Sequence, residues 1–533
     1  MKRRFRGLRR APDTRYDAVV IGSGIGGLIA ANLLAREGLG VLLLEHHYMV
    51  GGYCSTFRRG GYTFDAATHF YPLLGNPDTL TGRILGDLGV ETSWVKMDPV
   101  DTFHFPDGSR FAVPADLDAY LAKLKAEFPE EAAALDGFFA AVHESYLLGL
   151  LHYFRGRPMA RLERLVPYRD LTVQQALDRW FRDPKLKLLL TADCAHWGSP
   201  PGRTSFVFDS MLRLSYFLGN YYPRGGSQAF ADELARCFES RGGHILINTL
   251  ARRIVVERGT ARGVEIETLR GRRTGQRATV RCGVVISNAD LLQTLETLVG
   301  PEHLPAEAVA PVHRLRPTFP CWLTHLGLRG VAPEVLEQAQ GYYWDSWDMD
   351  RMGLDALRFK LFAPTLYEPA MAPGGEQILI IQKVLEMDYD AVEDWPAHKR
   401  GIEDSLLTHL ERVIPGIGKR IVVRSSASAR TSQRFTLNYQ GAMLGWEMSP
   451  EQLGEGRPAP ETAIRGLHCV GHWTQPGGGI TPVIVSAQRV AQAVLRNTEA
   501  LPPFPLSLAG DRAREQAEQR TVLRVSGEPS HVK

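Results

Sequence analysis

The sequence of 533 residues lacks the short motifs that mark several large classes of protein. Its six cysteines include no C-x-x-C pair, so neither a zinc site nor a disulfide framework is indicated, and a reducing cytoplasm is expected. The G-x-S-x-G, H-E-x-x-H and P-loop motifs are absent as well, which argues against hydrolases and kinases. With 52 glycines and 33 prolines, the chain is neither collagen-like nor of low complexity. No metal site is predicted.

Long hydrophobic runs are also scarce. Only residues 18–35 form an uncharged stretch of nearly membrane-spanning length. Glycines interrupt it at positions 22, 24, 26 and 27, a spacing that suits a strand turning tightly into a helix. We therefore expect a cytoplasmic protein without a transmembrane segment, either in solution or bound peripherally to a membrane.

Basic charge is concentrated only at the start of the chain. Residues 1–15 hold seven Lys and Arg residues and a single acid, Asp13, whereas the rest of the chain is close to neutral. A near-neutral body argues against a nucleic-acid partner. The basic leader is either a solvated start or an arm that touches anionic lipid.

Residues 22–27, Gly-Ser-Gly-Ile-Gly-Gly, carry the G-x-G-x-x-G fingerprint of dinucleotide-binding proteins. A buried strand is predicted over 17–21, a helix over 28–36 and a second strand over 41–44, which ends in Glu45. The first glycine allows the turn, the second lets the backbone approach a pyrophosphate, and the third lets helix and strand pack closely. The pattern predicts a βαβ unit that binds a dinucleotide through Gly22, Ser23, Gly24, Gly27 and Glu45.

The residues that follow distinguish a flavin from a nicotinamide. Gly51 and Gly52 come six residues after Glu45, and Phe64-Asp65 follows. The run from Asp17 to Asp65 resembles the start of the phytoene desaturase, carotenoid cis–trans isomerase and retinol saturase group of FAD-dependent oxidoreductases. The resemblance implies an FAD cofactor and an α/β fold, in which a Rossmann-like FAD-binding domain of the glutathione-reductase type carries an interleaved α+β substrate lobe.

Later segments match that group in the expected order, at residues 222–230, 242–257, 284–289 and 467–482, the last leading into a helix predicted over 483–495. A helix N-terminus favours the electron-rich edge of a flavin. Many related flavoproteins have an Asp after the closing glycine, whereas this chain has a His, which can donate or accept a hydrogen bond. The resemblance implies further FAD contacts from Ile254, Asn288, Gly471, His472, Gly479 and Ile480.

The same resemblance divides the chain into alternating parts. The FAD-binding domain is expected at 16–75, 221–300 and 456–500, the substrate lobe at 76–220 and 301–455, and a polar tail at 501–533. Within the lobe, helices are predicted over 116–127, 130–151 and 172–181, and strands over 323–328 and 377–382. Two apolar aromatic patches, 146–154 and 206–217, are interpreted either as core or as an apolar tunnel or membrane-docking face.

The chemistry belongs to the flavin, which accepts a hydride equivalent without an acid, base or metal from the protein. No catalytic residue is assigned. His69 and His472 are candidates, and His196 is another. Each can equally be a histidine whose ring only hydrogen-bonds to the backbone or contacts the cofactor.

The resemblance implies a hydrophobic polyene lipid substrate, carotenoid-like or isoprenoid, whose double bonds are desaturated or isomerised from cis to trans. The electron acceptor is expected to be oxygen or a quinone. Three alternatives remain: a retinol-saturase-like reductase, a flavin amine oxidase in which Trp473 helps to build an aromatic cage, and a non-catalytic prenyl-lipid-binding protein.

Overall fold

The computed structural model describes residues 15–191, 197–270, 274–351 and 358–496. The polar tail, nearly all of the basic leader and the candidate His196 therefore lie outside the described residues. No helix in the described ranges is both long enough and apolar enough to cross a bilayer.

The first sheet is built around the predicted βαβ unit. Its strand order is β10-β11-β12-β1-β2-β9, with β18 paired to β12, and β1 runs parallel to both β2 and β12. The four residues of β2 are all buried, as expected of a strand covered on both faces. The strands of this sheet are β1 (Arg15–Ile21), β2 (Val41–Leu44), β9 (His244–Leu246), β10 (Thr249–Glu257), β11 (Thr260–Thr268), β12 (Arg277–Ser287) and β18 (Leu467–Cys469).

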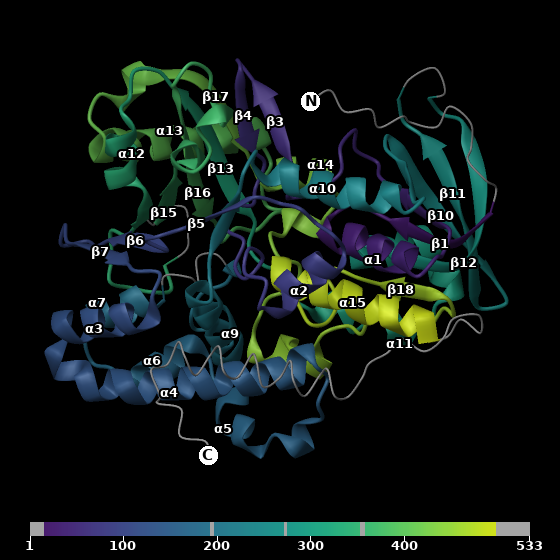
Figure 1. The fold of residues 1–533 in the computed structure, drawn as a ribbon, viewed down its shortest axis with the longest axis horizontal. Helices are drawn as coiled ribbons and strands as arrows, with labels where there is room; N and C mark the ends of the chain where they lie inside the picture. Colours follow the sequence, from purple (N-terminus) through teal and green to yellow (C-terminus); the bar gives the residue numbers. More distant parts are fainter. Residues whose placement is uncertain (1–14, 192–196, 271–273, 352–357, 497–533) are drawn as a thin grey trace.

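Three helices pack side by side against this sheet: α1 (Ile25–Arg36), α10 (Ser227–Ser240) and α15 (Ile480–Arg496) (Figure 1). The helices predicted over 28–36 and 483–495 are thus confirmed and begin three residues earlier than expected. Helix α1 is buried along almost its whole length, and Asn32 Nδ2 donates to the Leu234 carbonyl of α10 at 2.9 Å. Segments that lie 200 residues apart in the sequence therefore form one layer.

A second sheet, of order β17-β13-β16-β15-β14-β6-β7, lies beside the first. Leucines and isoleucines of helices α12 and α13 share a hydrophobic core with its central strands. The strands predicted over 323–328 and 377–382 are confirmed within β13 and β16. The elements of this part are β6 (Asp101–His104), β7 (Arg110–Val113), β13 (Cys321–Leu328), β14 (Gly341–Tyr343), β15 (Phe359–Phe362), β16 (Gln377–Val384), β17 (Ile421–Ala427), α12 (Pro333–Ala339) and α13 (Trp395–Val413).

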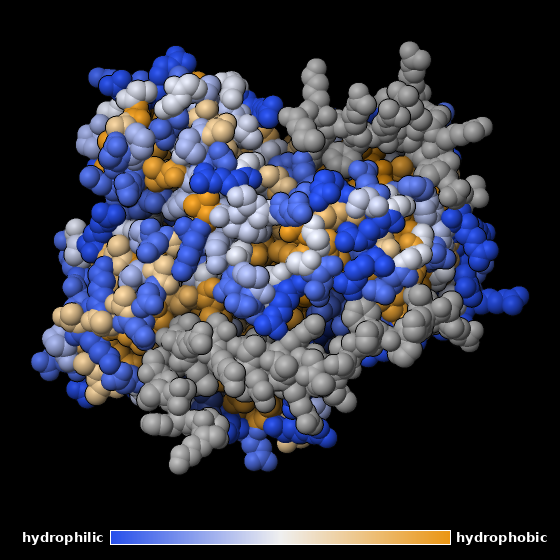
Figure 2. Space-filling view, viewed as in Figure 1, coloured by the Kyte–Doolittle hydropathy of each residue, from blue (hydrophilic) through white to orange (hydrophobic). Residues whose placement is uncertain are grey.

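A helical layer completes the molecule, at the lower left of Figure 1 and of the space-filling view in Figure 2. Asp116 and Thr172 cap α3 and α6 with their side chains, which is why these helices begin where the sequence predicts. The helix predicted over 130–151 is divided: a 3₁₀ turn precedes α4, and a wider π turn, η2, follows it. The elements of the layer are α3 (Leu117–Glu127), α4 (Ala132–Gly149), η2 (Leu150–Phe154), α6 (Val173–Trp180), α7 (Pro184–Leu190) and α9 (Phe206–Phe217).

Short elements join these three parts. They are β3 (Thr56–Arg59) paired with β4 (Tyr62–Asp65), β5 (Trp94–Lys96) paired with β8 (Tyr221–Pro223), α2 (Leu80–Asp87), α5 (Val166–Arg169), α11 (Ala306–Val309) and α14 (Ala429–Thr436).

The turn from β1 into α1 depends on the absence of a side chain at Gly27. A Cβ atom there would overlap the carbonyl oxygen of Gly22 and press on the side chain of Asn288. Strand and helix therefore approach as closely as the fingerprint predicts.

Gly27→Ala is expected to lower the free energy of unfolding by about 3 kcal/mol, because backbone rather than a flexible side chain must move. Gly86→Ala is the matched control: Gly86 is exposed in helix α2 with open space around its Cβ position, so alanine should be neutral or slightly stabilising. Urea unfolding of the two variants checks this, and equal stabilities would contradict the packing described.

Candidate cofactor and substrate site

One continuous cavity of about 920 Å³ runs along the junction of the first sheet, the second sheet and the helical layer. Its walls come from the ends of β1, β2 and β12, from residues 51–59 and 66–73, and from the closing segment 470–483. Of the predicted FAD contacts, Gly22, Ser23, Gly24, Glu45, Gly51, Gly52, Asn288, Gly471, His472, Gly479 and Ile480 all line it.

Glu45 organises the dinucleotide end of the cavity. Its carboxylate accepts hydrogen bonds from the Ser23 amide at 3.0 Å, the Ser23 hydroxyl at 2.6 Å and the His47 amide at 2.7 Å. Burial alone raises the pKa of Glu45, but the hydrogen bond and charge of His46 and the hydrogen bonds from Ser23 and His47 outweigh it and leave this pKa below its usual value. Glu45 is therefore ionised and holds the glycine turn against the end of β2.

The glycine turn makes a cradle of backbone. The Gly51 amide donates to the Ser23 carbonyl at 2.9 Å, and a Cβ on Gly52 would lie 3.2 Å from the Gly24 Cα. Helix α1 begins at this point, and its N-cap, Gly24, supplies no side-chain cap. The unpaired N–H groups of a first helical turn bind phosphate well, so the residues present fit a dinucleotide pyrophosphate.

Asn288, at the end of β12, packs against glycines from two segments of the chain. Its side-chain amide lies 2.9 Å from the Cβ position of Gly24, 2.5 Å from that of Gly26 and 2.8 Å from that of Gly471. Side chains at these glycines would collide with the Asn288 amide. The position of Asn288 therefore requires glycine at all three positions.

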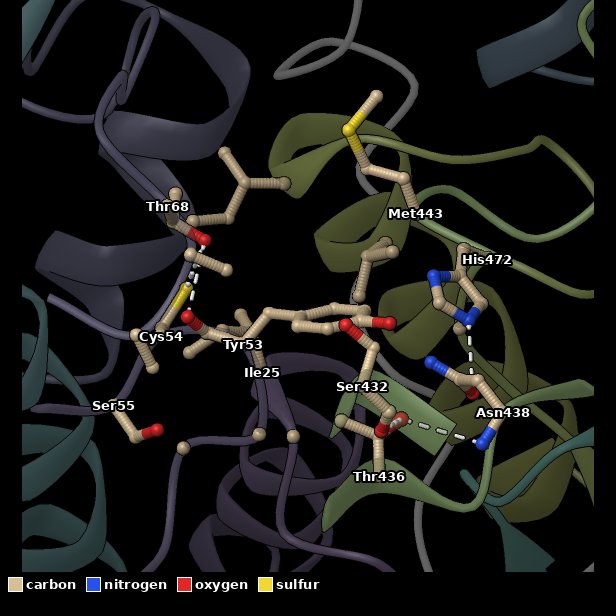
Figure 3. A pocket seen from close by; sticks show the side chains of 18 of the residues that line it. Ile25, Tyr53, Cys54, Ser55, Thr68, Ser432, Thr436, Asn438, Met443 and His472 are labelled. Atoms are coloured by element: carbon tan, nitrogen blue, oxygen red, sulfur yellow. Dashed lines mark hydrogen bonds between the residues drawn. The ribbon is translucent and has the colours of Figure 1, made fainter. Parts of the chain in front are cut away.

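A polar group that the sequence pattern missed contacts the closing segment from outside it. Asn438 Oδ1 lies 3.4 Å from His472 Nε2 and accepts from Trp473 Nε1 at 3.1 Å. Tyr53 lies across the cavity from the opposite wall, and its hydroxyl donates to the Ala442 carbonyl at 3.0 Å (Figure 3). Tyr53 directly follows the predicted Gly51-Gly52 pair, which is the one signal that marks it in the sequence.

A buried arginine supports this segment. Arg457 is 1% exposed and donates to the carbonyl of His472 at 2.8 Å and to that of Trp446 at 3.0 Å. Burial lowers the pKa of Arg457 to about 9, and burial together with the charge of Arg457 lowers the pKa of His472 to about 3. His472 is therefore neutral at pH 7 and can donate or accept one hydrogen bond at each ring nitrogen, according to its tautomer.

Two of the predicted contacts do not reach the cavity. Ile254 is buried in the core beneath the first sheet, and residues 249–251 of the same strand line the cavity instead. Gly27 is also absent from the wall, because its role is to pack α1 on β1. The FAD contacts of the other residues stay predictions.

His69 does lie in the cavity wall, in the loop after β4. Its ring stacks on Phe362 with 5.0 Å between ring centroids. Burial, with the charges of His325 and Lys360, lowers the pKa of His69 to about 3. The side chain is therefore neutral at pH 7, and its part in catalysis stays a prediction.

Beyond the glycine cradle, the cavity extends into the helical layer as an apolar arm. Both aromatic patches contribute: some of their residues pack in the core, as Phe206 and Val207 do, while others face the cavity. Among the described residues that line the whole cavity, Glu45 is the only carboxylate. The apolar arm is lined by Tyr146, Leu150, Phe154, Trp197, Phe208, Met211, Leu212 and Tyr216.

Glu45→Gln is expected to lose retained FAD and about 2 kcal/mol of stability at neutral pH, because charge-assisted hydrogen bonds become neutral ones. A carboxyl group whose pKa is lowered in the folded state stabilises above its ordinary pKa, and this contribution disappears as the pH falls through the lowered value. The stability difference between wild type and Glu45→Gln should therefore shrink on acidification, as followed by urea unfolding at several pH values. The exposed Glu334→Gln, in helix α12, should show neither effect, and a pH-independent difference would contradict this role of Glu45.

Comparison with known proteins agrees with this arrangement. Residues 25–495 match the family of flavin containing amine oxidoreductases. Prolycopene isomerase 1, chloroplastic, of an Oncidium hybrid cultivar is 28% identical over 512 residues, covering 90% of this chain and 84% of that protein. The neurosporene-forming phytoene desaturase of Cereibacter sphaeroides is 27% identical and covers 89% and 94%. All-trans-retinol 13,14-reductase of Rattus norvegicus is 26% identical and covers 82% and 78%.

Solved structures share the fold. An oxidoreductase from Methanosarcina mazei superposes with a TM-score of 0.59 at 18% identity, covering 89% of this chain and 99% of that one. Cyclohexylamine oxidase from Brevibacterium oxydans gives 0.60 at 17% identity, covering 91% and 99%. The predicted α/β fold with its FAD-binding domain, the flavin cofactor and the oxidoreductase class are confirmed. The chain belongs to the flavin-containing amine oxidoreductase family.

Proposed function

We propose that this FAD-dependent oxidoreductase acts on the double bonds of a carotenoid-like or isoprenoid polyene, by desaturation or cis–trans isomerisation. The observation that carries the proposal is that the glycine cradle and the apolar arm line one and the same cavity. The relatives named as prolycopene isomerase, phytoene desaturase and retinol reductase support it.

The residues present fit FAD at the cradle end. Ser23, Gly24 and Gly52 would face the pyrophosphate, Glu45 the ribose, and the N-terminus of α15 at Ile480 the flavin ring. When bound, FAD supplies the hydride chemistry. The chain's own residues bind and orient it and keep water away from the apolar arm.

The apolar arm suits a polyene because it offers dispersion contacts with few charges. Tyr146 and Leu150 come from α4 and the π turn that follows, whereas Phe208 and Met211 come from α9. The two elements pack against each other, so the arm is a gap within a helix–helix interface. A long, flat hydrocarbon fits such a gap better than a compact polar molecule does.

The amine oxidase alternative is less well supported by the wall of the cavity. Trp473 is 2% exposed, packs edge-on against Trp446 with 4.7 Å between ring centroids and donates to Asn438. Trp473 lines the cavity, but these contacts fix the orientation of its ring. Residues 477–479, which precede α15, are all glycine and present no side chain to an amine.

The purified holoenzyme tests the proposal through an anaerobic visible spectrum, recorded before and after addition of a poly-cis carotenoid, with the product analysed by chromatography. Bleaching of the oxidised flavin with a longer conjugated product indicates desaturation. Isomerisation at unchanged mass, seen only with flavin reduced beforehand, indicates an isomerase. Reoxidation by oxygen or by a quinone then identifies the electron acceptor.

Other outcomes of this experiment would overturn the proposal or narrow it. Consumption of a double bond by reduced flavin would assign a retinol-saturase-like reduction within the polyene class. Bleaching by a primary amine and not by any polyene would favour an amine oxidase, and a preparation without flavin absorbance that still binds prenyl lipid would favour the non-catalytic alternative.

We further propose that the enzyme works at the cytoplasmic surface of a membrane, which it touches through residues 150–169. This segment starts at the apolar arm, carries five arginines against one acid, Glu163, and exposes Val166. Basic and apolar groups side by side suit an anionic lipid surface.

The double variant Arg157→Gln/Arg161→Gln should bind vesicles containing phosphatidylglycerol about tenfold or more weakly than wild type, since each basic residue contributes about 1 kcal/mol near such a surface. Co-sedimentation at low and high salt measures this, because screening should weaken wild-type binding too. The matched control is Arg262→Gln/Arg277→Gln, two exposed arginines on β11 and β12. Equal loss in both double variants would rule out a specific docking segment.

A further inference from the structure

Several side chains in the cavity wall have buried polar atoms without a hydrogen-bond partner among the described residues, and Nε1 of Trp197 is one of these atoms. Two other side chains carry this inference. Neither ring nitrogen of His69, nor Oε1 of Gln382, has a hydrogen-bond partner in the described part of the chain. The two residues are 3% and 7% exposed and both line the cavity. Buried polar groups nearly always have a partner, so a bound molecule is expected to supply it here.

The neighbouring His325 shows the opposite situation. It is equally buried, but its Nδ1 lies 3.3 Å from the Ser425 carbonyl oxygen and its Nε2 2.9 Å from that of Asp65. The single N–H of the neutral His325 ring therefore has a backbone carbonyl to donate to, whereas neither ring nitrogen of His69 has a hydrogen-bond partner among the described residues.

His69 and Gln382 belong to one face of the second sheet. The ring of His69 stacks on Phe362 of β15. Phe362 and Lys360 are two residues apart in this strand and so share a face, and Lys360 pairs directly with Gln382 of β16. The unpaired ring nitrogens of His69 and the unpaired amide oxygen of Gln382 thus belong to the same part of the cavity wall.

The chemistry of this part of the wall selects a neutral ligand. Lys360 is already engaged by Asp101 and lies over the Phe70 ring at 3.7 Å. A neutral imidazole offers one N–H donor and one nitrogen acceptor, and the amide oxygen of Gln382 is a further acceptor. A hydroxyl group both donates and accepts, whereas a hydrocarbon does neither.

We propose that His69 and Gln382 bind a hydroxyl group of the substrate, so that the enzyme prefers a hydroxylated polyene to the corresponding hydrocarbon. This inference rests on the proposed function and names the substrate class within it. The apolar arm would take the chain of the polyene, and the two polar residues would determine specificity. Sites that hydrogen-bond a substrate hydroxyl reject analogues without it strongly, because their own buried polar groups stay unpaired.

The test uses two matched pairs that differ only in hydroxyl groups: β-carotene with zeaxanthin, and deoxyretinol with retinol. Binding to the holoenzyme is followed through perturbation of the flavin spectrum. For wild type, the hydroxylated member of at least one pair should bind at least tenfold more tightly. His69→Phe, which keeps a stacking ring, and Gln382→Met should each reduce this ratio several-fold, whereas Leu323→Met, beside Gln382 on the neighbouring strand, should keep it.

A readout without substrate separates this role from a structural one. Because the nitrogens of His69 have no hydrogen-bond partner among the described residues, His69→Phe should retain FAD with an unchanged spectrum and unfold at the same or a higher temperature. Loss or perturbation of the flavin in His69→Phe with an unchanged binding ratio would mean that His69 serves the cofactor, and would overturn the proposal. Equal wild-type affinities within both pairs would overturn it as well. Failure of the proposed function is distinguishable, because then no polyene, hydroxylated or not, would bind or react.

Discussion

The site depends on one close packing contact, in which the side chain of Asn288 lies against the backbone of glycines from two separate segments. Its amide fills the space beside Gly24 and Gly26 of the fingerprint turn and Gly471 of the closing segment. Residues that are 450 positions apart are thereby brought within contact distance, and the cradle exists only because none of these glycines has a side chain. Close packing of this kind tolerates almost no change in side-chain volume. The packing therefore fixes the shape of the cofactor end of the cavity.

Several titratable groups of the site are held in one protonation state at neutral pH. Glu45 is ionised because His46, Ser23 and His47 surround it with hydrogen bonds and positive charge, while His69 and His472 are held neutral by burial and neighbouring cations. Arg457 is a buried cation held by backbone carbonyls. The polar groups of the site are therefore suited to bind and orient a bound molecule, and few of them have a pKa near neutrality that would allow proton transfer at neutral pH. This agrees with chemistry that the cofactor itself supplies.

The cavity as a whole arises where three parts of the molecule meet rather than within any one of them. The helical layer contributes its aromatic patches, the second sheet contributes a partly polar face, and the first sheet contributes the end of the cradle. Leu150 and Met211 face the cavity, whereas Phe206, in the same patch as Met211, packs in the core. The hydrophobic pattern of the sequence does not distinguish a cavity-lining residue from a core residue, because both are equally apolar.

The sequence by itself determined the βαβ unit, the glycine turn and Glu45, because these features depend on local periodicity and on glycines at fixed spacings. It also located most of the cavity wall at the cofactor end. Only the tertiary structure decided that Ile254 stays in the core, that Tyr53 and Asn438 meet His472, and that Gln382 and His69 share one wall. Such contacts join segments hundreds of residues apart, and their geometry depends on how whole sheets and helices pack, which no short motif records.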